Sequence, residues 1–141
     1  MFTIRLATQN DIDEICALDQ IARQDAHRVE FIQRAISAQT CYVGERGQIV
    51  GYAVLDYSFF EMGFVSMLYI HPDWRRHGAG VALMRHCETV CRTEKLFTST
   101  NLSNAPMQAL LARSGYQLSG VIHDLDENDP ELVYVKRLGR D

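Results

Sequence analysis

The feature that most constrains the fold is a segment near the middle of the chain that passes from an apolar stretch, through a short basic loop, into a helical pattern. Phe64–Ile70 is apolar and rich in strand-forming residues. Pro72 should end this strand, because proline restricts the backbone conformation of the residue before it and has no backbone N–H to donate. Gly78 follows, and apolar residues recur at helical spacing over Gly80–Lys95. The segment predicts a strand, a tight loop and a helix.

The loop in this segment has the chemistry of an anion site. Glycine has no Cβ, so Gly78 and Gly80 allow backbone N–H groups to approach a ligand closely. The unpaired N–H groups and positive dipole end of the following helix favour an anion such as pyrophosphate. Arg75 and Arg76 add positive charge in a chain whose formal net charge is −4. Glycines at a helix start can also be simple turn residues, but the adjacent arginines favour the anion site.

Two common nucleotide-binding motifs do not fit this segment. A P-loop requires Gly-Lys-Ser or Gly-Lys-Thr, and the chain contains neither. The Rossmann motif requires a small residue where Leu83 stands, and it places its glycines directly after the strand. Here His71–His77 intervenes. The sequence therefore excludes both motifs.

The rest of the chain alternates short strand and helix patterns, which predicts an α/β domain with a mixed sheet. A helix should start at Thr8–Asp11, which has the form of a capping box. Arg92 and Lys95 are expected at the negative end of the long helix. The expected strands are Phe2–Leu6, Cys41–Glu45, Gln48–Asp56, Phe64–Ile70, Leu96–Thr100, Tyr116–Ile122 and Leu132–Arg137, and the later helices are Val29–Ile36, Gly80–Lys95 and Ala105–Ser114.

Composition narrows the class of protein. The 141 residues suit a single domain over 1–141, and 47% apolar with 23% charged residues is ordinary for a globular protein. Fourteen basic and eighteen acidic side chains argue against a nucleic-acid partner. Apolar runs never exceed four residues, so no membrane span is expected. Without an export signal, the four cysteines predict reduced thiols in the cytoplasm.

Two motifs resemble those of one enzyme superfamily. Arg75-x-x-Gly78-x-Gly80 after an apolar strand resembles the Arg/Gln-x-x-Gly-x-Gly/Ala motif of the GNAT N-acetyltransferases. Farther along, Thr98–Pro106 and then Ala109–Tyr116 resemble that family's strand, asparagine, helix and Gly-Phe segment. The element order agrees as well. The resemblance implies a GNAT-like α/β fold, with a mixed, mostly antiparallel sheet splayed between the fourth and fifth strands and flanked by about four helices.

The resemblance also implies a binding site for acetyl-CoA as co-substrate, with no metal. Backbone groups of Leu68, Tyr69 and Ile70 are expected to bind the pantetheine arm as an added strand would. Asn104 matches the asparagine that contacts CoA. Arg75, which opens the motif, is also expected to bind CoA. The residues expected to hold the pyrophosphate through backbone N–H groups are Arg76, His77, Gly78, Ala79, Gly80 and Val81.

The implied activity is transfer of an acetyl group from acetyl-CoA to a primary amine of a small molecule or peptide, by direct attack through a tetrahedral intermediate. An alkyl amine has a pKa of about 10, so it must lose a proton before it attacks. The oxyanion needs a donor, and the backbone N–H of Leu68 is a candidate. The thiol that leaves has a pKa of about 8.5 and needs little acid help.

The chain departs from the family at the residues that usually transfer protons. Leu111 stands where many relatives carry a tyrosine acid, and Ser99 where some carry a glutamate base. The candidate catalytic residues are Glu61 as a base through water, Tyr116 as an acid, and Ser66 beside the splayed strands. The alternative is that Glu61 is a solvated loop residue and Tyr116 a core aromatic. The missing tyrosine motivates an alternative function, a non-catalytic acyl-CoA-binding sensor.

The acceptor side is less defined. The acidic stretch Asp124–Glu131 would favour a cationic amine, or it is a solvated hairpin loop. An apolar cluster could line an acceptor pocket, complete the core or form a homodimer contact; its members are Phe59, Phe60, Met62 and Phe64. Cys87 and Cys91 share the apolar face of the long helix, so they are expected in the core rather than as metal ligands.

Overall fold

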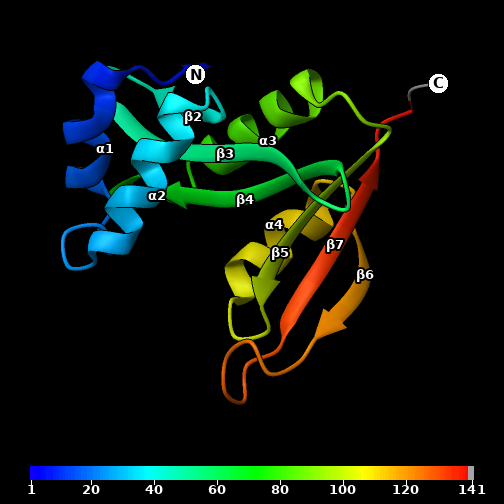
Figure 1. Ribbon diagram of the computed structural model, residues 1–141. Helices are drawn as coiled ribbons and strands as arrows, with labels where there is room; N and C mark the ends of the chain where they lie inside the picture. The colour runs from blue at the N-terminus through cyan, green and yellow to red at the C-terminus, as the bar shows by residue number, and fades with distance from the viewer. Residues whose placement is uncertain (140–141) are drawn as a thin grey trace. The chain divides into compact units, whose positions relative to one another are not determined.

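The computed structural model describes residues 1–139, which form seven strands and four α-helices (Figure 1). The expected order of elements is confirmed. Short 3-10 turns at Gln9–Asp11 and Pro72–Trp74 precede the first and third helices. The strands are β1 (Thr3–Leu6), β2 (Cys41–Glu45), β3 (Ile49–Phe59), β4 (Met62–Ile70), β5 (Lys95–Asn101), β6 (Gln117–Ile122) and β7 (Glu131–Arg137), and the helices are α1 (Ile12–Leu18), α2 (Ala26–Ser37), α3 (Ala79–Val90) and α4 (Ala105–Arg113).

The strands are hydrogen-bonded in the order β1-β2-β3-β4-β5-β7-β6. The pairs β1–β2, β2–β3, β5–β7 and β6–β7 are antiparallel, whereas β4 and β5 run parallel. Their ladder is short and pairs Gly63–Val65 with Leu96–Thr98. The predicted mixed, mostly antiparallel sheet is therefore confirmed, and the short ladder lies between the two strands where a splay was expected.

The chain divides into two compact units, which are described separately. The N-terminal unit comprises Met1–Leu55 and Met67–Thr89. The C-terminal unit comprises Asp56–Ser66 and the chain from Val90 onward.

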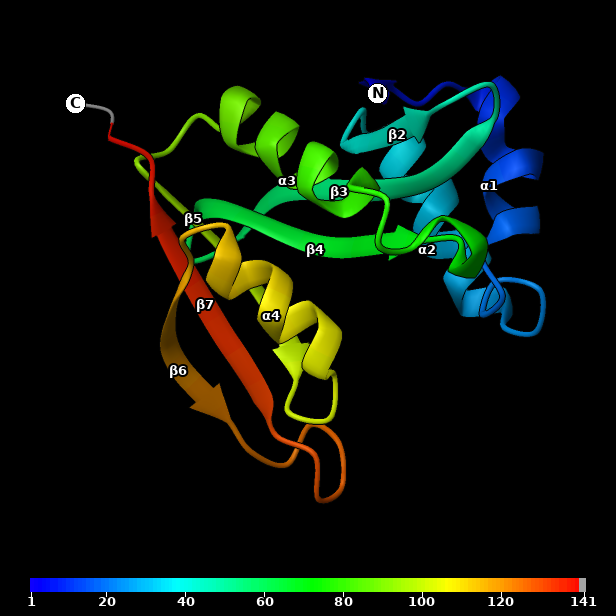
Figure 2. The same ribbon diagram turned by 180° about the vertical axis from the view of Figure 1, so that it is seen from behind.

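In the N-terminal unit, helices cover both faces of β2 and β3 (Figures 1 and 2). Cys41 and Val43 belong to the buried cluster that α1 and α2 complete. Alternate residues of β2 face the other way: the Tyr42 ring lies 4.7 Å from the His86 ring of α3. A Cβ at Gly44 would lie 3.6 Å from Leu83 of the same helix. The alternation of β2 therefore places α3 opposite α1 and α2.

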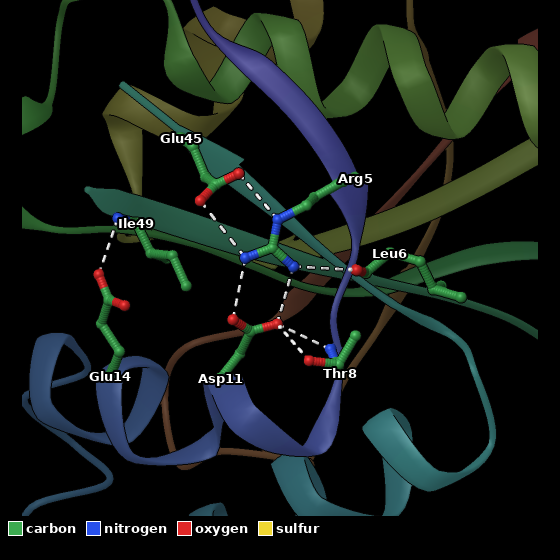
Figure 3. Close-up of polar contacts among 7 residues, drawn as sticks. All are labelled: Arg5, Leu6, Thr8, Asp11, Glu14, Glu45 and Ile49. Atoms are coloured by element: carbon green, nitrogen blue, oxygen red, sulfur yellow. Dashed lines mark hydrogen bonds and ion pairs between the residues drawn. The ribbon is translucent and has the colours of Figure 1, made fainter. Parts of the chain in front are cut away.

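An ionic network joins the first elements of this unit (Figure 3). The Arg5 guanidinium donates to both carboxylate oxygens of Asp11, at 2.8 and 2.9 Å, and its Nε donates to Glu45 at 2.8 Å. Asp11 also accepts the Thr8 N–H at 2.7 Å, as the predicted capping box requires. The hydrogen bonds from Arg5 lower the pKa of Asp11 to about 2.

The core of the N-terminal unit contains a buried polar cluster. Asp19 is fully buried, and its carboxylate accepts hydrogen bonds from the Tyr52 hydroxyl at 2.5 Å and from Arg28 at 2.7 Å. The other Asp19 oxygen accepts the backbone N–H groups of Ile21 and Ala22. These hydrogen bonds compensate the Asp19 carboxylate for its lost hydration. Because they join Asp19 both to the residues after α1 and to Tyr52 of β3, they hold this part of the chain against β3.

The predicted extent of α3 is wrong at its C-terminal end. The helix ends at Val90, so Arg92 and Lys95 do not lie in its last turn. The Arg92 N–H instead donates to the Tyr57 hydroxyl. The Thr93 hydroxyl accepts the Gly63 N–H at 2.9 Å and donates to the Lys95 carbonyl at 2.7 Å. Threonine competes in this way with helical hydrogen bonds, and the chain turns into β5.

In the C-terminal unit, α4 lies over one face of β5 and β7 (Figure 2). Leu96, Thr98 and Thr100 point to that face and are buried. The Lys136 ammonium of β7 lies 5.6 Å from the ring centre of Tyr116, which follows α4. The helix ends before Gly115, whose φ of +90° is the left-handed conformation in which a glycine commonly terminates a helix.

Candidate functional site

The loop between β4 and α3 has the backbone geometry of an anion cradle. Arg76 and Gly78 adopt φ values of +67° and +90°. The Gly78 carbonyl accepts the N–H of Ala82 at 3.0 Å and so begins the first turn of α3. Among residues 1–139, no protein group accepts a hydrogen bond from the backbone N–H groups of Arg76–Val81. This continuous run of unpaired donors stands where the sequence predicts the pyrophosphate site.

The cradle is open on one side and packed on the other. Arg76, His77 and Gly78 are exposed, and a Cβ at Gly78 would have no heavy atom within 4 Å. The next residues, Ala79 and Gly80, are buried. The helix start is therefore anchored in the unit, while the loop residues before it are exposed.

Arg75 turns away from the cradle toward the end of β4. Its Nε donates to the Ile70 carbonyl at 2.9 Å, and its guanidinium carbon lies 5.5 Å from the Tyr69 ring centre. The Tyr69 hydroxyl in turn accepts the Gln20 N–H at 3.2 Å. Arg75 therefore ties the strand end to the loop, and the exposed Arg76 is the arginine beside the unpaired N–H groups.

The last residues of β4 present alternate backbone groups to opposite edges. The His71 N–H donates to the Val50 carbonyl of β3 at 2.8 Å, and the Tyr69 carbonyl lies against Gly51 of the same strand. The backbone groups of His71 and Tyr69 therefore face β3. Successive strand residues direct their backbone groups to opposite edges. Those of Leu68 and Ile70 therefore face away from β3, although the Ile70 carbonyl already accepts the Arg75 hydrogen bond.

His71 and the cysteines of α3 have structural environments. The His71 Nδ1 accepts the Asp73 N–H at 3.0 Å and caps the 3-10 turn that follows β4. Cys87 is fully buried and Cys91 is 3% exposed. A Cβ at Gly63 would collide with the Cys91 sulfur, so this thiol fills space beside β4. The buried positions of the two cysteines agree with the core role expected for them.

Asn104 and the three candidate catalytic residues all belong to the C-terminal unit. The Asn104 side-chain oxygen caps α4 by accepting the Met107 N–H at 3.2 Å, which leaves its amide NH₂ for another acceptor. Glu61 is exposed at the tip of the β3–β4 hairpin. Tyr116 is 4% exposed, as expected of a core aromatic. The Ser66 Oγ is buried, with no hydrogen-bond partner in residues 1–139.

The acidic loop between β6 and β7 is anchored to its neighbours. The Asn101 amide donates to Asp126 at 2.8 Å, and the Ser103 hydroxyl donates to Asp129 at 2.6 Å. The hydroxyl of Ser99 donates to Glu131 at 2.6 Å. Sequence reasoning missed this last pair, because the two residues are 32 positions apart and no short motif links them.

The aromatic residues near the β3–β4 hairpin form one cluster with β5. The Phe59 ring stacks on Phe64 with centroids 5.1 Å apart, and it lies 5.0 Å from the Phe97 ring. Phe60 is 84% exposed at the hairpin tip. Part of the predicted apolar cluster therefore packs within the C-terminal unit.

No helix in the described part of the chain combines the length and apolar character needed to cross a bilayer. The part of the chain that the structure describes also contains no group of three or more His, Cys, Asp or Glu side chains arranged to hold a metal ion.

Comparison with known proteins identifies what the fold resembles. Residues 9–116 match the family model described as the acetyltransferase (GNAT) family. A GNAT-family acetyltransferase structure from Bacillus cereus ATCC 10987 is 30% identical, with a TM-score of 0.93 over 99% of both chains. A search of curated proteins found no match.

Two further structures share the fold at lower identity. A GNAT-family acetyltransferase from Streptococcus agalactiae 2603 has a TM-score of 0.80 at 21% identity, covering 96% of this chain and 95% of its own. Ard1 from Thermoplasma volcanium has a TM-score of 0.82 at 16% identity, covering 96% and 97%.

Proposed function

Because the chain belongs to the GNAT acetyltransferase family, we propose that it is an N-acetyltransferase that transfers the acetyl group of acetyl-CoA to a primary amine of a small molecule or peptide. The observation that carries the proposal is the run of unpaired N–H groups over Arg76–Val81. The family match includes parts of both compact units, which supports a single N-acetyltransferase domain over 1–141.

The cradle fits the diphosphate of CoA. Unpaired N–H groups at a helix start bind phosphate oxygens, and hydrogen bonds to charged groups contribute about 1.5–3 kcal/mol each. Gly78 leaves the space where a side chain would obstruct the approach of the diphosphate. Arg76 supplies a positive charge beside these groups, while its neighbour Arg75 holds the strand end in position.

The pantetheine arm is proposed to lie along β4 in the manner of an added strand. The backbone groups of Leu68 and the Ile70 N–H face away from β3, so we propose them as the hydrogen-bond partners of the pantetheine arm. Tyr69 is less suited to this role, because its carbonyl faces β3. The Asn104 amide NH₂ is proposed as a further donor to CoA.

In the proposed reaction the acceptor nitrogen attacks the acetyl carbonyl, the new C–N bond forms, and the C–S bond breaks to release CoA. The Leu68 N–H is the proposed donor to the oxygen that gains charge. Glu61, Ser66 and Tyr116 stay predictions for proton transfer. Leu111, at the usual tyrosine position, is fully buried and has no proton to give.

Calorimetry and a thiol-release assay test the proposal together. The protein should bind acetyl-CoA clearly more tightly than acetyl-pantetheine, because only acetyl-CoA carries the diphosphate. With spermidine, phenethylamine or a lysine peptide as acceptor, it should release free CoA above the background rate. Equal affinity for both thioesters would contradict the proposed cradle. Binding of acetyl-CoA without release of CoA by any amine would instead support the acyl-CoA sensor.

A further inference from the structure

The Ser99–Glu131 pair lies on the face of the C-terminal sheet opposite the face that α4 covers. In the β5–β7 ladder, Asn101 pairs with Glu131 and Ser99 pairs with Val133, and paired residues point to the same face. The buried β5 residues beneath α4, Leu96, Thr98 and Thr100, alternate with Ser99 and Asn101 along the strand and therefore point to the other face. The Glu131 carboxylate reaches along the strand to Ser99, whose hydroxyl donates to its Oε2 at 2.6 Å.

The pair stands where the β4–β5 ladder stops. Val65 and Thr98 are the last paired residues of the two strands, and the Thr98 hydroxyl donates to the Val65 carbonyl at 2.9 Å. Ser66 and Ser99 are the next residues, so by strand alternation they lie on the same face. The Ser66 Oγ is buried and has no partner in residues 1–139. A polar group without a partner at this point is consistent with a ligand that comes close to it.

The hydrogen bond to Ser99 leaves part of the Glu131 carboxylate available. Ser99 occupies Oε2, and no donor within the described part of the chain reaches Oε1. A carboxylate accepts hydrogen bonds at both oxygens, so Oε1 can accept one from an ammonium group. The hydrogen bond from Ser99 also limits rotation of the Glu131 side chain. A proton acceptor must be held in a fixed position, and this bond provides that.

We propose that Glu131 is the proton acceptor for the amine substrate, a role that rests on the proposed acetyl transfer. The substrate ammonium gives one proton to the Glu131 carboxylate and becomes a neutral amine. Its lone pair then attacks the acetyl carbonyl, the C–S bond breaks, and the second nitrogen proton is taken up with the departing thiolate. Glu131 afterwards releases its proton to solvent. Ser99 is a positioning residue that holds the carboxylate.

Replacing Glu131 by glutamine tests the role directly. E131Q keeps an oxygen that can accept the Ser99 hydrogen bond but removes the charge and the proton-accepting group. We expect kcat for an alkyl amine such as phenethylamine to fall about 100-fold or more, the usual contribution of general base catalysis. The affinity for acetyl-CoA, measured by calorimetry, should remain unchanged. E94Q is the matched control, because Glu94 is an exposed acid of the same unit that lies before β5 and should keep wild-type kcat.

A second acceptor separates proton transfer from a structural role. Trifluoroethylamine is largely neutral at pH 7 and needs no base to lose a proton before it attacks. The kcat penalty of E131Q should therefore be much smaller with this amine than with phenethylamine. An equal penalty for both amines, or a loss of acetyl-CoA affinity, would show that Glu131 only supports the structure and would overturn the proposal.

The outcomes also distinguish this proposal from the proposed function. Wild-type transfer with an unchanged kcat in E131Q would overturn the role of Glu131 and leave the acetyltransferase intact. A wild-type protein that binds acetyl-CoA but transfers to no amine would overturn both.

Discussion

The loop at the start of α3 and the sheet end at Ser99 and Glu131 differ in what they are made of. The loop offers backbone N–H groups from consecutive residues, and the space left by Gly78 lets a ligand approach them. The sheet end depends on two side chains brought together across the β5–β7 ladder. The proposed diphosphate site is therefore built from one local segment of the chain, whereas the proposed proton acceptor depends on tertiary structure.

The two parts should therefore differ in the sequence changes that they tolerate. Every residue except proline supplies a backbone N–H group, so the cradle constrains the backbone conformation more than the residue type. A proton acceptor requires a particular functional group, but several strands can present it to the same face. The carboxylate that Ser99 lacks on β5 is supplied by Glu131 on β7.

The largest effect is expected from Gly78→Val, which should weaken acetyl-CoA binding about 100-fold in calorimetry. The valine side chain would occupy the open side of the cradle and disfavour the φ of +90° that directs the N–H groups. Loss of one or more hydrogen bonds to a charged group, at about 1.5–3 kcal/mol each, accounts for a change of this size.

Gly47→Val is the matched control for that experiment. Gly47 has a φ of +77°, is exposed in the turn between β2 and β3, and has no heavy atom within 4 Å of a Cβ. Both variants should lose about 1–3 kcal/mol of unfolding free energy through backbone strain. Only Gly78→Val should lose affinity, and equal loss in both variants would contradict the cradle.

A smaller effect should separate the two arginines of the loop. Arg75→Ala removes the hydrogen bond to the Ile70 carbonyl and the contact with Tyr69, and we expect about fivefold weaker acetyl-CoA binding at any salt concentration. Arg76→Ala removes an exposed charge, so its loss of about twofold to fivefold should disappear in high salt. Calorimetry at low and high ionic strength measures both.

Arg75→Lys sharpens this prediction because it keeps the charge but not the planar guanidinium. It should resemble Arg75→Ala if the residue acts by holding the strand end. Wild-type affinity in Arg75→Lys, with a salt-dependent loss in Arg75→Ala, would instead mean that Arg75 binds the diphosphate through its charge.

The sequence was sufficient to predict the parts that depend on local pattern. The strand ending before Pro72, the bend at Gly78 and the terminator at Gly115 each follow from one residue type and its neighbours. The end of α3 was missed because helical spacing continues past Val90, and the bonds of Thr93 that stop it involve Gly63 on a distant strand.

Tertiary contacts place the side chains whose roles the local pattern leaves open. The pattern placed Arg75 in the motif, but only the fold directs its side chain to the Ile70 carbonyl. The sequence does not single out Glu131 among the acids of Asp124–Glu131, because an acid at the end of an acidic loop looks like one more member of that loop. Its distinction comes from the register of β7 on β5, which single-sequence reasoning does not provide.

The smallest effect concerns Glu61, the acid first considered as the base. Phe60 and Glu61 form the hairpin tip with φ values of +53° and +63°, a conformation that favours glycine. Glu61→Gly should therefore raise the free energy of unfolding by about 0.5–1 kcal/mol in a urea titration. Glu61→Gln keeps the strain and should leave stability unchanged. Because we assign proton acceptance to Glu131, neither substitution should lower kcat with phenethylamine. A matching fall in kcat in both variants would return the role of base to Glu61.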